Sequence, residues 1–251
     1  MPAKGVGLDR CDGVPSRGAP SVVLPRTFSL RRPTRTLRAV LVASGDPLPV
    51  DARWLNEADL VVAADGGAAW LASIGRRPDA LVGDLDSVDL DRVRRLEADG
   101  VVVERHPIDK DTSDCELALA YGLRQGADGI VMLGALGGGR LDHELANLLL
   151  LAGSPSAPDH ELRIVRGSTS LRGLHPGQSL TIVARPGSLV SLLPVGGDAE
   201  GVATSGLRYP LRDEPLPMGS TRGLSNVVVA ESASVQLRAG TLLVIEIETE
   251  E

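Results

Sequence analysis

The chain has 251 residues, of which 43% are hydrophobic, and its formal net charge at pH 7 is −7, so it can bury a substantial core in one large or two small domains. The acidic balance excludes nucleic acid as an expected partner, because duplex binding depends on neutralising phosphates with Lys and Arg. The longest apolar run, residues 145–153, is too short to cross a bilayer, so no membrane partner is expected. The chain has only two cysteines, Cys11 and Cys115, which excludes a disulfide framework and a zinc site and fits a cytoplasmic protein.

The first segment, residues 1–37, is a basic leader. Residues 1–38 contain eight Lys and Arg residues against two aspartates, and they have no hydrophobic period. We therefore expect a disordered basic extension. A transit peptide, an interaction tail and a start codon assigned too early all remain open.

Residues 38–153 alternate short apolar runs with helical patterns, which predicts an α/β domain with a parallel sheet flanked by helices. The expected strands are residues 38–43, 60–64, 80–82, 101–105 and 129–133. The expected helices are residues 50–58, 67–74, 90–98, 113–125 and 142–151. Ligands of such sheets bind at the carboxyl ends of the strands, so the segments that follow these strands are expected to meet at one rim.

The pattern changes near residues 153–160, where Gly, Ser and Pro accumulate. Short alternating strands then recur between Gly, Pro and Ser turns, and they predict an all-β, antiparallel sandwich over residues 160–251. The expected strands are residues 162–166, 179–184, 189–195, 226–230, 234–237 and 241–248.

Four aspartates in two short motifs point to a divalent metal. Asp84 and Asp86 follow the third expected strand, and Asp111 and Asp114 lie where the fourth expected helix begins. Mg²⁺ prefers oxygen ligands and is usually held by one or two carboxylates together with substrate phosphates. An ordinary turn at residues 83–87 and an ordinary helix N-cap at Asp111 remain the alternative for each motif alone.

Other segments suggest a bound phosphate. Asp65, Gly66 and Gly67 stand between a strand and a helix, where glycines let backbone amides approach an anion, and Gly45 follows the first strand in the same way. Lys110 is one of only two lysines, beside 24 arginines, and a compact ammonium can contact phosphate as a point charge.

A glycine run at residues 134–139 delivers Arg140, which can bind phosphate with its planar fork, directly before Asp142. Asp142 can cap the following helix or support a metal. His143 is more simply interpreted as a surface residue.

Together, and in this order, the motifs at residues 65–67, 83–87, 110–117, 138–147 and 219–226 resemble those of the thiamine pyrophosphokinase family. The likeness runs from about residue 40 to residue 247 and leaves out only the leader. It implies an α/β catalytic, ATP-binding domain, a β-sandwich for thiamine binding and dimerisation, and a homodimer whose active sites lie between subunits. The implied reaction moves the β,γ-diphosphoryl group of ATP to the hydroxyethyl oxygen of thiamine and releases AMP.

The resemblance also implies roles for particular residues. Mg²⁺ and the polyphosphate would be held by the acidic group Asp65, Asp84, Asp86, Asp111 and Asp114. The nucleotide-binding set is Gly45, Asp65, Gly66, Gly67, Lys110, Ser113 and Arg140. Arg140 and Asp142 would position the transferred group, and either Asp84 or Asp111 would accept the proton of the alcohol. Ser220, Ser225 and Asn226 match the segment that the family uses around thiamine.

The sequence departs from the family pattern at a few positions. Ala69 stands where the family often has Asn, and Ser113 replaces the common Thr. Some members stack thiamine on a tryptophan near the C-terminus, and the position that corresponds most nearly to it here is occupied by Val244. Two other functions remain open. One is a haloacid-dehalogenase-like phosphohydrolase with Asp84 as nucleophile, and the other is a non-catalytic, nucleotide-binding regulator.

Overall fold

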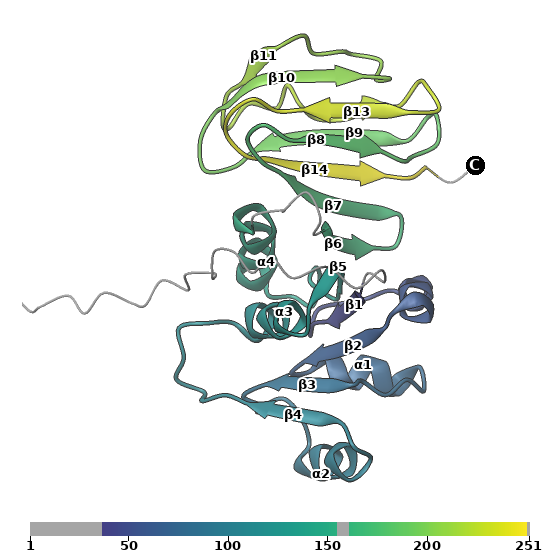
Figure 1. The fold of residues 1–251 in the computed structure, drawn as a ribbon, viewed down its shortest axis with the longest axis vertical. Coiled ribbons are helices and arrows are strands. Elements are labelled where there is room, and N and C mark those ends of the chain that lie inside the picture. Colours follow the sequence, from purple (N-terminus) through teal and green to yellow (C-terminus); the bar gives the residue numbers. More distant parts are fainter. Residues whose placement is uncertain (1–36, 155–160, 250–251) are drawn as a thin grey trace, which may run out of the picture. The chain divides into compact units, whose positions relative to one another are not determined.

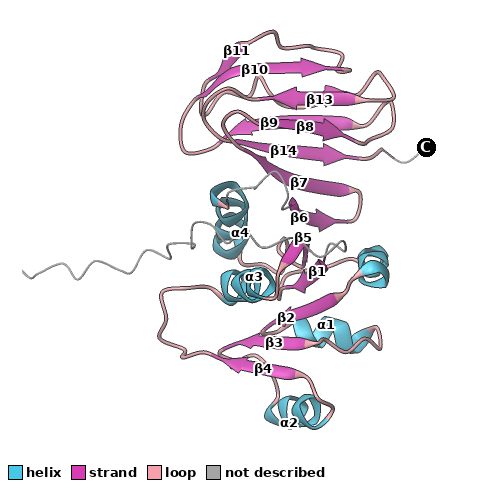
Figure 2. Cartoon of the chain, viewed as in Figure 1, coloured by secondary structure: helices cyan, strands magenta, loops and turns pink. Residues whose placement is uncertain are grey.

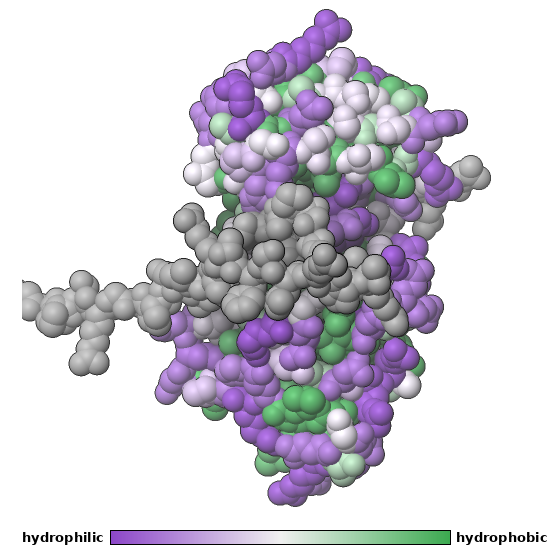
Figure 3. Space-filling view, in the orientation of Figure 1, coloured by the Kyte–Doolittle hydropathy of each residue, from purple (hydrophilic) through white to green (hydrophobic). Residues whose placement is uncertain are grey.

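The computed structural model describes residues 37–154 and 161–249 (Figure 1). The predicted disordered leader therefore lies outside the described residues, apart from Leu37. Most of the predicted linker at residues 153–160 lies outside them as well. Of the described part of the chain, no helix is long and apolar enough to cross a membrane. On the face drawn in Figure 3, hydrophilic side chains separate the apolar patches.

The N-terminal part contains a five-stranded parallel array in the order β5-β1-β2-β3-β4. Its strands are β1 (Leu37–Val42), β2 (Leu60–Ala64), β3 (Ala80–Gly83), β4 (Val102–Arg105) and β5 (Ala127–Leu133). Alternate residues of β1 enter different cores: Ala39 and Leu41 belong to one, and Val40 and Val42 to the other. Both faces of the array are therefore buried, which explains the nearly continuous Val, Leu and Ala content of these strands.

Helices cover both faces (Figure 2). They are the 3₁₀ helix η1 (Pro49–Glu57), α1 (Gly67–Ser73), α2 (Leu90–Ala98), α3 (Asp114–Arg124) and α4 (Leu141–Gly153). Apolar residues of α3 and α4 enter the core of Ala39 and Leu41, and those of η1, α1 and α2 enter the other. Two helix starts are fixed by side-chain caps, because Asp89 accepts a hydrogen bond from the Asp91 N–H and Ser113 accepts one from the Glu116 N–H.

The C-terminal part forms two antiparallel layers. β6 (Glu161–Arg166), β7 (Thr169–Leu174), β14 (Leu242–Ile247), β9 (Leu189–Pro194) and β12 (Asn226–Val227) extend the first sheet to ten strands. The second sheet has the order β11-β10-β13-β8, with β8 (Ser179–Ile182), β10 (Ala199–Ser205), β11 (Glu214–Leu216) and β13 (Ala233–Gln236). A core that includes Ile182, Val202, Val235 and Val244 lies between the layers. The predicted fold class is confirmed.

Three strands were not predicted: β7, β10 and β11. β7 contains Arg172, which donates to the Glu246 carboxylate and to the Thr181 carbonyl, so a buried ion pair replaces the expected apolar residue. The sheet also continues across the predicted linker, because β6 pairs in parallel with β5 and antiparallel with β7. The placing of a domain boundary near residues 153–160 stays a prediction.

Candidate active site

A cavity of about 490 Å³ lies at the carboxyl ends of β1, β2, β3 and β5, the rim that the sequence predicts. Its lining comes from segments far apart in the chain. These are residues 43–45 after β1, 64–65 at the end of β2, 84–87 after β3, 108–115 before and within α3, and 134–147 between β5 and α4.

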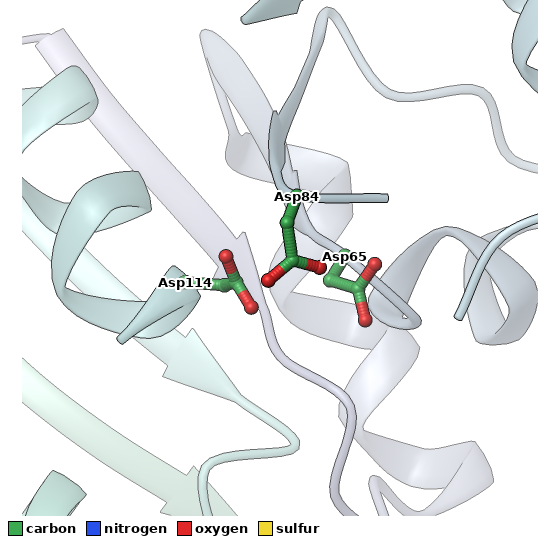
Figure 4. Close-up of side chains that lie close together, drawn as sticks. All are labelled: Asp65, Asp84 and Asp114. Carbon is green, nitrogen blue, oxygen red and sulfur yellow. The ribbon is translucent and has the colours of Figure 1, made fainter. Parts of the chain in front are cut away.

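Three carboxylates meet in this cavity: Asp65, Asp84 and Asp114 each place an oxygen within 4.8 Å of the other two. Asp84 lies between Asp65 and Asp114 in Figure 4. One oxygen of Asp65 is buried and has no hydrogen-bond partner among the described residues, and burial raises the pKa of this carboxyl. A buried, unpartnered carboxylate oxygen beside two more carboxylates is a donor set that fits Mg²⁺.

Lys110 is the cation of this cluster. Its Nζ lies 2.5 Å from Asp84 Oδ2 and 3.1 Å from Asp114 Oδ1. The hydrogen bond from Lys110 lowers the pKa of Asp84. Burial opposes the charge of Lys110, but the hydrogen bonds to Asp84 and Asp114 outweigh it and raise the pKa of the ammonium. Both shifts favour the charged forms of Asp84 and Lys110.

Backbone conformation brings the carboxylates this close. Asp65 and Leu85 have positive φ angles, 43° and 63°, which are uncommon for residues with a side chain. Gly83 has φ 149°, and a Cβ there would lie 3.0 Å from Asp114 Oδ1 and 3.2 Å from Asp65 Cβ. Local strain of this kind gathers at functional sites.

Two of the predicted metal ligands lie apart from the cluster. Asp86 lines the cavity, but its carboxylate accepts a hydrogen bond from Ser87 Oγ at 3.0 Å and is not among the three that meet. Asp111 is exposed and does not line the cavity. Asp111 is also not the N-cap of α3, because Ser113 fills that position. The alternative role considered for it is therefore wrong.

The predicted glycines hold the loops close together. Gly45 lines the cavity, and a Cβ there would overlap the carbonyl oxygens of Gly134 and Leu136. Gly66 is the N-cap of α1 and Gly67 its first residue, packed against the Val42 carbonyl. Neither of these two lines the cavity, so of the three glycines only Gly45 borders it.

Arg140 and Asp142 form an exposed, two-point ion pair, with Nε to Oδ1 at 2.9 Å and the second nitrogen to Oδ2 at 2.7 Å. This pair lowers the pKa of Asp142. Arg140 lines the cavity and Asp142 does not. Asp142 also does not cap α4, whose N-cap is Arg140. His143, interpreted from the sequence as a surface residue, is exposed and also borders the cavity.

Asn147 is a residue to which the sequence analysis gave no role. Its side-chain amide donates to the Ala135 carbonyl at 2.8 Å and is buried, so it fastens the glycine run to α4. Its position within an otherwise apolar helical stretch is the signal that could have revealed it, because a buried amide requires a partner.

The predicted thiamine residues lie in the segment before β12 and at its start, and none of them lines the cavity. Ser225 has φ 55°, and its N–H donates to Ser191 Oγ at 3.0 Å. The Asn226 side chain accepts from the Tyr209 N–H and donates to the Tyr209 carbonyl, at 3.0 and 2.7 Å. Asn226 thus anchors the backbone of its own chain, and Ser220 Oγ also accepts a hydrogen bond from the Arg222 N–H at 3.2 Å.

Two family models match this chain. Residues 52–164 match the model described as thiamin pyrophosphokinase, catalytic domain, and residues 179–242 match the one described as thiamin pyrophosphokinase, vitamin B1 binding domain. The two matches span both structural parts and together cover most of the sequence. The chain belongs to the thiamine pyrophosphokinase family. The acidic cluster lies in the part matched by the catalytic model.

Individual relatives agree with this membership. A thiamine pyrophosphokinase of Bacillus subtilis is 25% identical over 212 residues, covering 83% of this chain and 98% of the relative. Thiamine pyrophosphokinase 1 of Arabidopsis thaliana is 30% identical over 183 residues, 68% of this chain and 66% of the relative. The crystal structure of the Bacillus subtilis enzyme superimposes with a TM-score of 0.74 at 26% identity and covers 85% of this chain and all of the other.

Proposed function

We propose that this enzyme is an ATP:thiamine diphosphotransferase, which transfers the β,γ-diphosphoryl group of ATP to the hydroxyethyl oxygen of thiamine and releases AMP. The observation that carries the proposal is the cluster of Asp65, Asp84 and Asp114, which lies at the sheet rim of the part matched by the catalytic family model. Neither the phosphohydrolase nor the non-catalytic regulator is favoured by the family matches.

Mg²⁺ is the metal that the donor set suits, with Asp65, Asp84 and Asp114 as its protein ligands. When bound, it would neutralise negative charge on the polyphosphate. Arg140, on the lining segment between β5 and α4, offers a planar fork for phosphate oxygens. The predicted roles of Asp86 as a ligand and of Asp111 and Asp142 in catalysis stay predictions.

The chain contributes mainly position and charge. Attack on the β-phosphorus requires the alcohol and the AMP leaving group to lie roughly in line, so orientation supplies much of the rate. Asp84 borders the cavity and Asp111 does not, which favours Asp84 over Asp111 as a proton acceptor. Because Lys110 lowers the pKa of Asp84, Asp84 would be a weak base. We therefore assign Asp84 a larger part in binding than in proton transfer.

We propose further that the enzyme is a homodimer with thiamine bound by the segment around Ser220 and Ser225 of the second subunit. The support is that these residues do not line the acidic cavity of their own chain. A cytoplasmic location stays part of the proposal.

The test is a product analysis. Purified protein with ATP, Mg²⁺ and thiamine is expected to yield AMP and thiamine diphosphate in equal amounts, measured by separating nucleotides and thiamine esters over time. Release of ADP or free phosphate in place of AMP would exclude diphosphoryl transfer.

A further inference from the structure

Lys110 contacts two of the carboxylates that a divalent metal would also need. Its ammonium lies 2.5 Å from Asp84 and 3.1 Å from Asp114, and its side chain is only 14% exposed. These two carboxylates are two of the three members of the acidic cluster. The ammonium therefore lies within the proposed metal site and not beside it.

No second Lys or Arg of the cavity lining shares this position. Among the described lining residues, the only other Lys or Arg is Arg140, which is paired with Asp142. Among the residues that the structure describes, Lys110 is thus the one lysine or arginine of the lining that contacts the three carboxylates.

The same two carboxylates cannot serve both cations well. Mg²⁺ requires oxygen ligands at about 2.0–2.1 Å in a near-octahedral arrangement, and an ammonium bonded to the same carboxylates would stand within a few ångströms of it. Like charges at such distances repel strongly where water is partly excluded. An ammonium has three donors and a flexible four-carbon stem, so it can turn to a new anion.

We propose that Lys110 and a divalent metal compete for Asp84 and Asp114, and that a polyphosphate relieves the competition by giving the ammonium another anion to bind. Metal alone then binds weakly, and metal and nucleotide strengthen each other's binding. The second half of this mechanism rests on the proposed function, since it requires a polyphosphate substrate, whereas the competition itself does not.

The experiment measures binding of Mn²⁺ by the electron paramagnetic resonance signal of the free ion, in wild type and in Lys110→Gln, first without nucleotide. The variant is expected to bind Mn²⁺ more tightly, on the order of tenfold, because it lacks the competing charge. For the complex of Mn²⁺ with α,β-methylene-ATP, in which the bond between the α- and β-phosphates cannot be cleaved, the order is expected to reverse, since the variant has lost a phosphate contact.

The reversal separates competition from simpler roles. If Lys110 were only a nucleotide contact, Mn²⁺ alone would bind both proteins equally. If it only stabilised the loop, both affinities would fall in the variant. Either result, or no measurable Mn²⁺ binding to either protein, would overturn the proposal. If wild type formed no AMP from ATP and thiamine, the proposed function would be contradicted, but the Mn²⁺ measurements would still test the competition.

Arg105→Gln is the matched control. Arg105 ends β4 beside Gly83 and pairs with Glu97, so this variant removes one positive charge near the rim without touching the cluster. Its affinity for Mn²⁺ should stay within about twofold of wild type. An equal tightening would show that net charge, and not competition, is responsible. Should Lys110→Gln fail to fold, recovery of its thermal transition with Mn²⁺ supports competition, and failure to recover it at saturating Mn²⁺ opposes it.

Discussion

Asp84 contacts both Lys110 and the turn that follows β3. It accepts from Lys110 Nζ and, more weakly, from the Asp86 N–H at 3.3 Å, and it follows β3 at the rim. The Asp84 carboxylate therefore holds Lys110 and the turn in place and is itself a proposed metal ligand. We expect its charge to affect activity more than the stability of the fold.

We expect Asp84→Asn to lower turnover by about 100-fold or more, because the neutral amide weakens both metal binding and the hold on Lys110. The amide oxygen can still accept a hydrogen bond, so the thermal transition should change little. Steady-state AMP formation and thermal melting measure the two effects. Asp91→Asn, on the exposed face of α2, is the control and should keep full activity. Near-normal turnover of Asp84→Asn would remove this residue from the metal site.

Gly83 sets how closely the carboxylates approach one another. Its φ of 149° disfavours any side chain, and an added Cβ would lie 3.0 Å from Asp114 Oδ1. Gly83→Ala is expected to cost about 1–3 kcal/mol of unfolding free energy and to lower activity as well. Urea denaturation and AMP formation test this.

Gly100 provides the comparison, because its φ of 83° is also left-handed but nothing lies within 4 Å of an added Cβ. Gly100→Ala should lose stability and keep its activity. If both variants kept full activity, close contact at Gly83 would not matter for the site.

At this scale, sequence reasoning anticipated part of the acidic cluster, while the roles of its residues stay predictions. Asp65, Asp84 and Asp114 follow from strand ends and a helix start, and they do meet. Residue spacing could not show that α3 begins only at Asp114, after its Ser113 cap. That start leaves Asp111 in the preceding loop and exposed. The direction of a loop side chain depends on such tertiary detail, which the local pattern does not contain.

At the scale of elements, Glu104 connects β4 to α3 and to the loop that carries Lys110. Its carboxylate accepts two hydrogen bonds from Arg124, at 2.8 and 2.7 Å, and lies 2.9 Å from His106 Nε2. Burial would raise the pKa of Glu104, but the contacts with His106 and Arg124 outweigh it and lower the pKa.

A lowered carboxyl pKa means that the ionised form stabilises the fold. This contribution is present above the unfolded pKa, about 4.3, and is lost as pH falls through the lower folded value. Glu104→Gln is therefore expected to cost about 0.5–1 kcal/mol at pH 7, and the difference from wild type should disappear in more acidic solution. Melting curves over a pH series measure it.

Glu97→Gln is a suitable control, since its ion pair with Arg105 is more exposed and should contribute less than about 0.5 kcal/mol. A difference at Glu104 that grew toward low pH would contradict the assigned direction.

The elements of the α/β half were predictable because apolar runs of four to seven residues alternate with amphipathic helices. In the C-terminal half, β7 was not predicted because Arg172 and Gly173 interrupt its alternation of apolar and polar residues. Arg172 is tolerated there only because Glu246 of β14, 74 residues away, neutralises it. β11 has only three residues and includes Pro215, so its sequence is too short to show a strand pattern. A short stretch of sequence also contains no information about which distant strand it pairs with.

At the scale of the whole molecule, the proposed thiamine segment and the acidic cluster belong to different halves of the chain. If each active site joins the acidic cavity of one subunit to Ser220 and Ser225 of the other, then two inactive variants can restore each other. A site built within one subunit cannot behave in this way.

We expect a mixture of Asp84→Asn with Ser220→Trp, refolded together in equal amounts, to recover about a quarter of wild-type activity. Half of the dimers would be mixed, and each mixed dimer would have one site free of both changes. AMP formation before and after mixing, with sedimentation to establish the dimer, gives the measurement. Activity no greater than that of the separate variants, with dimers present, would contradict the shared site.

The continuous ten-stranded sheet has a consequence for dividing the protein. Because β6 pairs directly with β5, a fragment that stops at residue 154 would leave one side of β5 without its neighbour. Unpaired strand edges recruit other chains and promote aggregation. The catalytic half is therefore a poor candidate for separate expression, and its evolutionary exchange as an independent module would require a new strand to cover that edge.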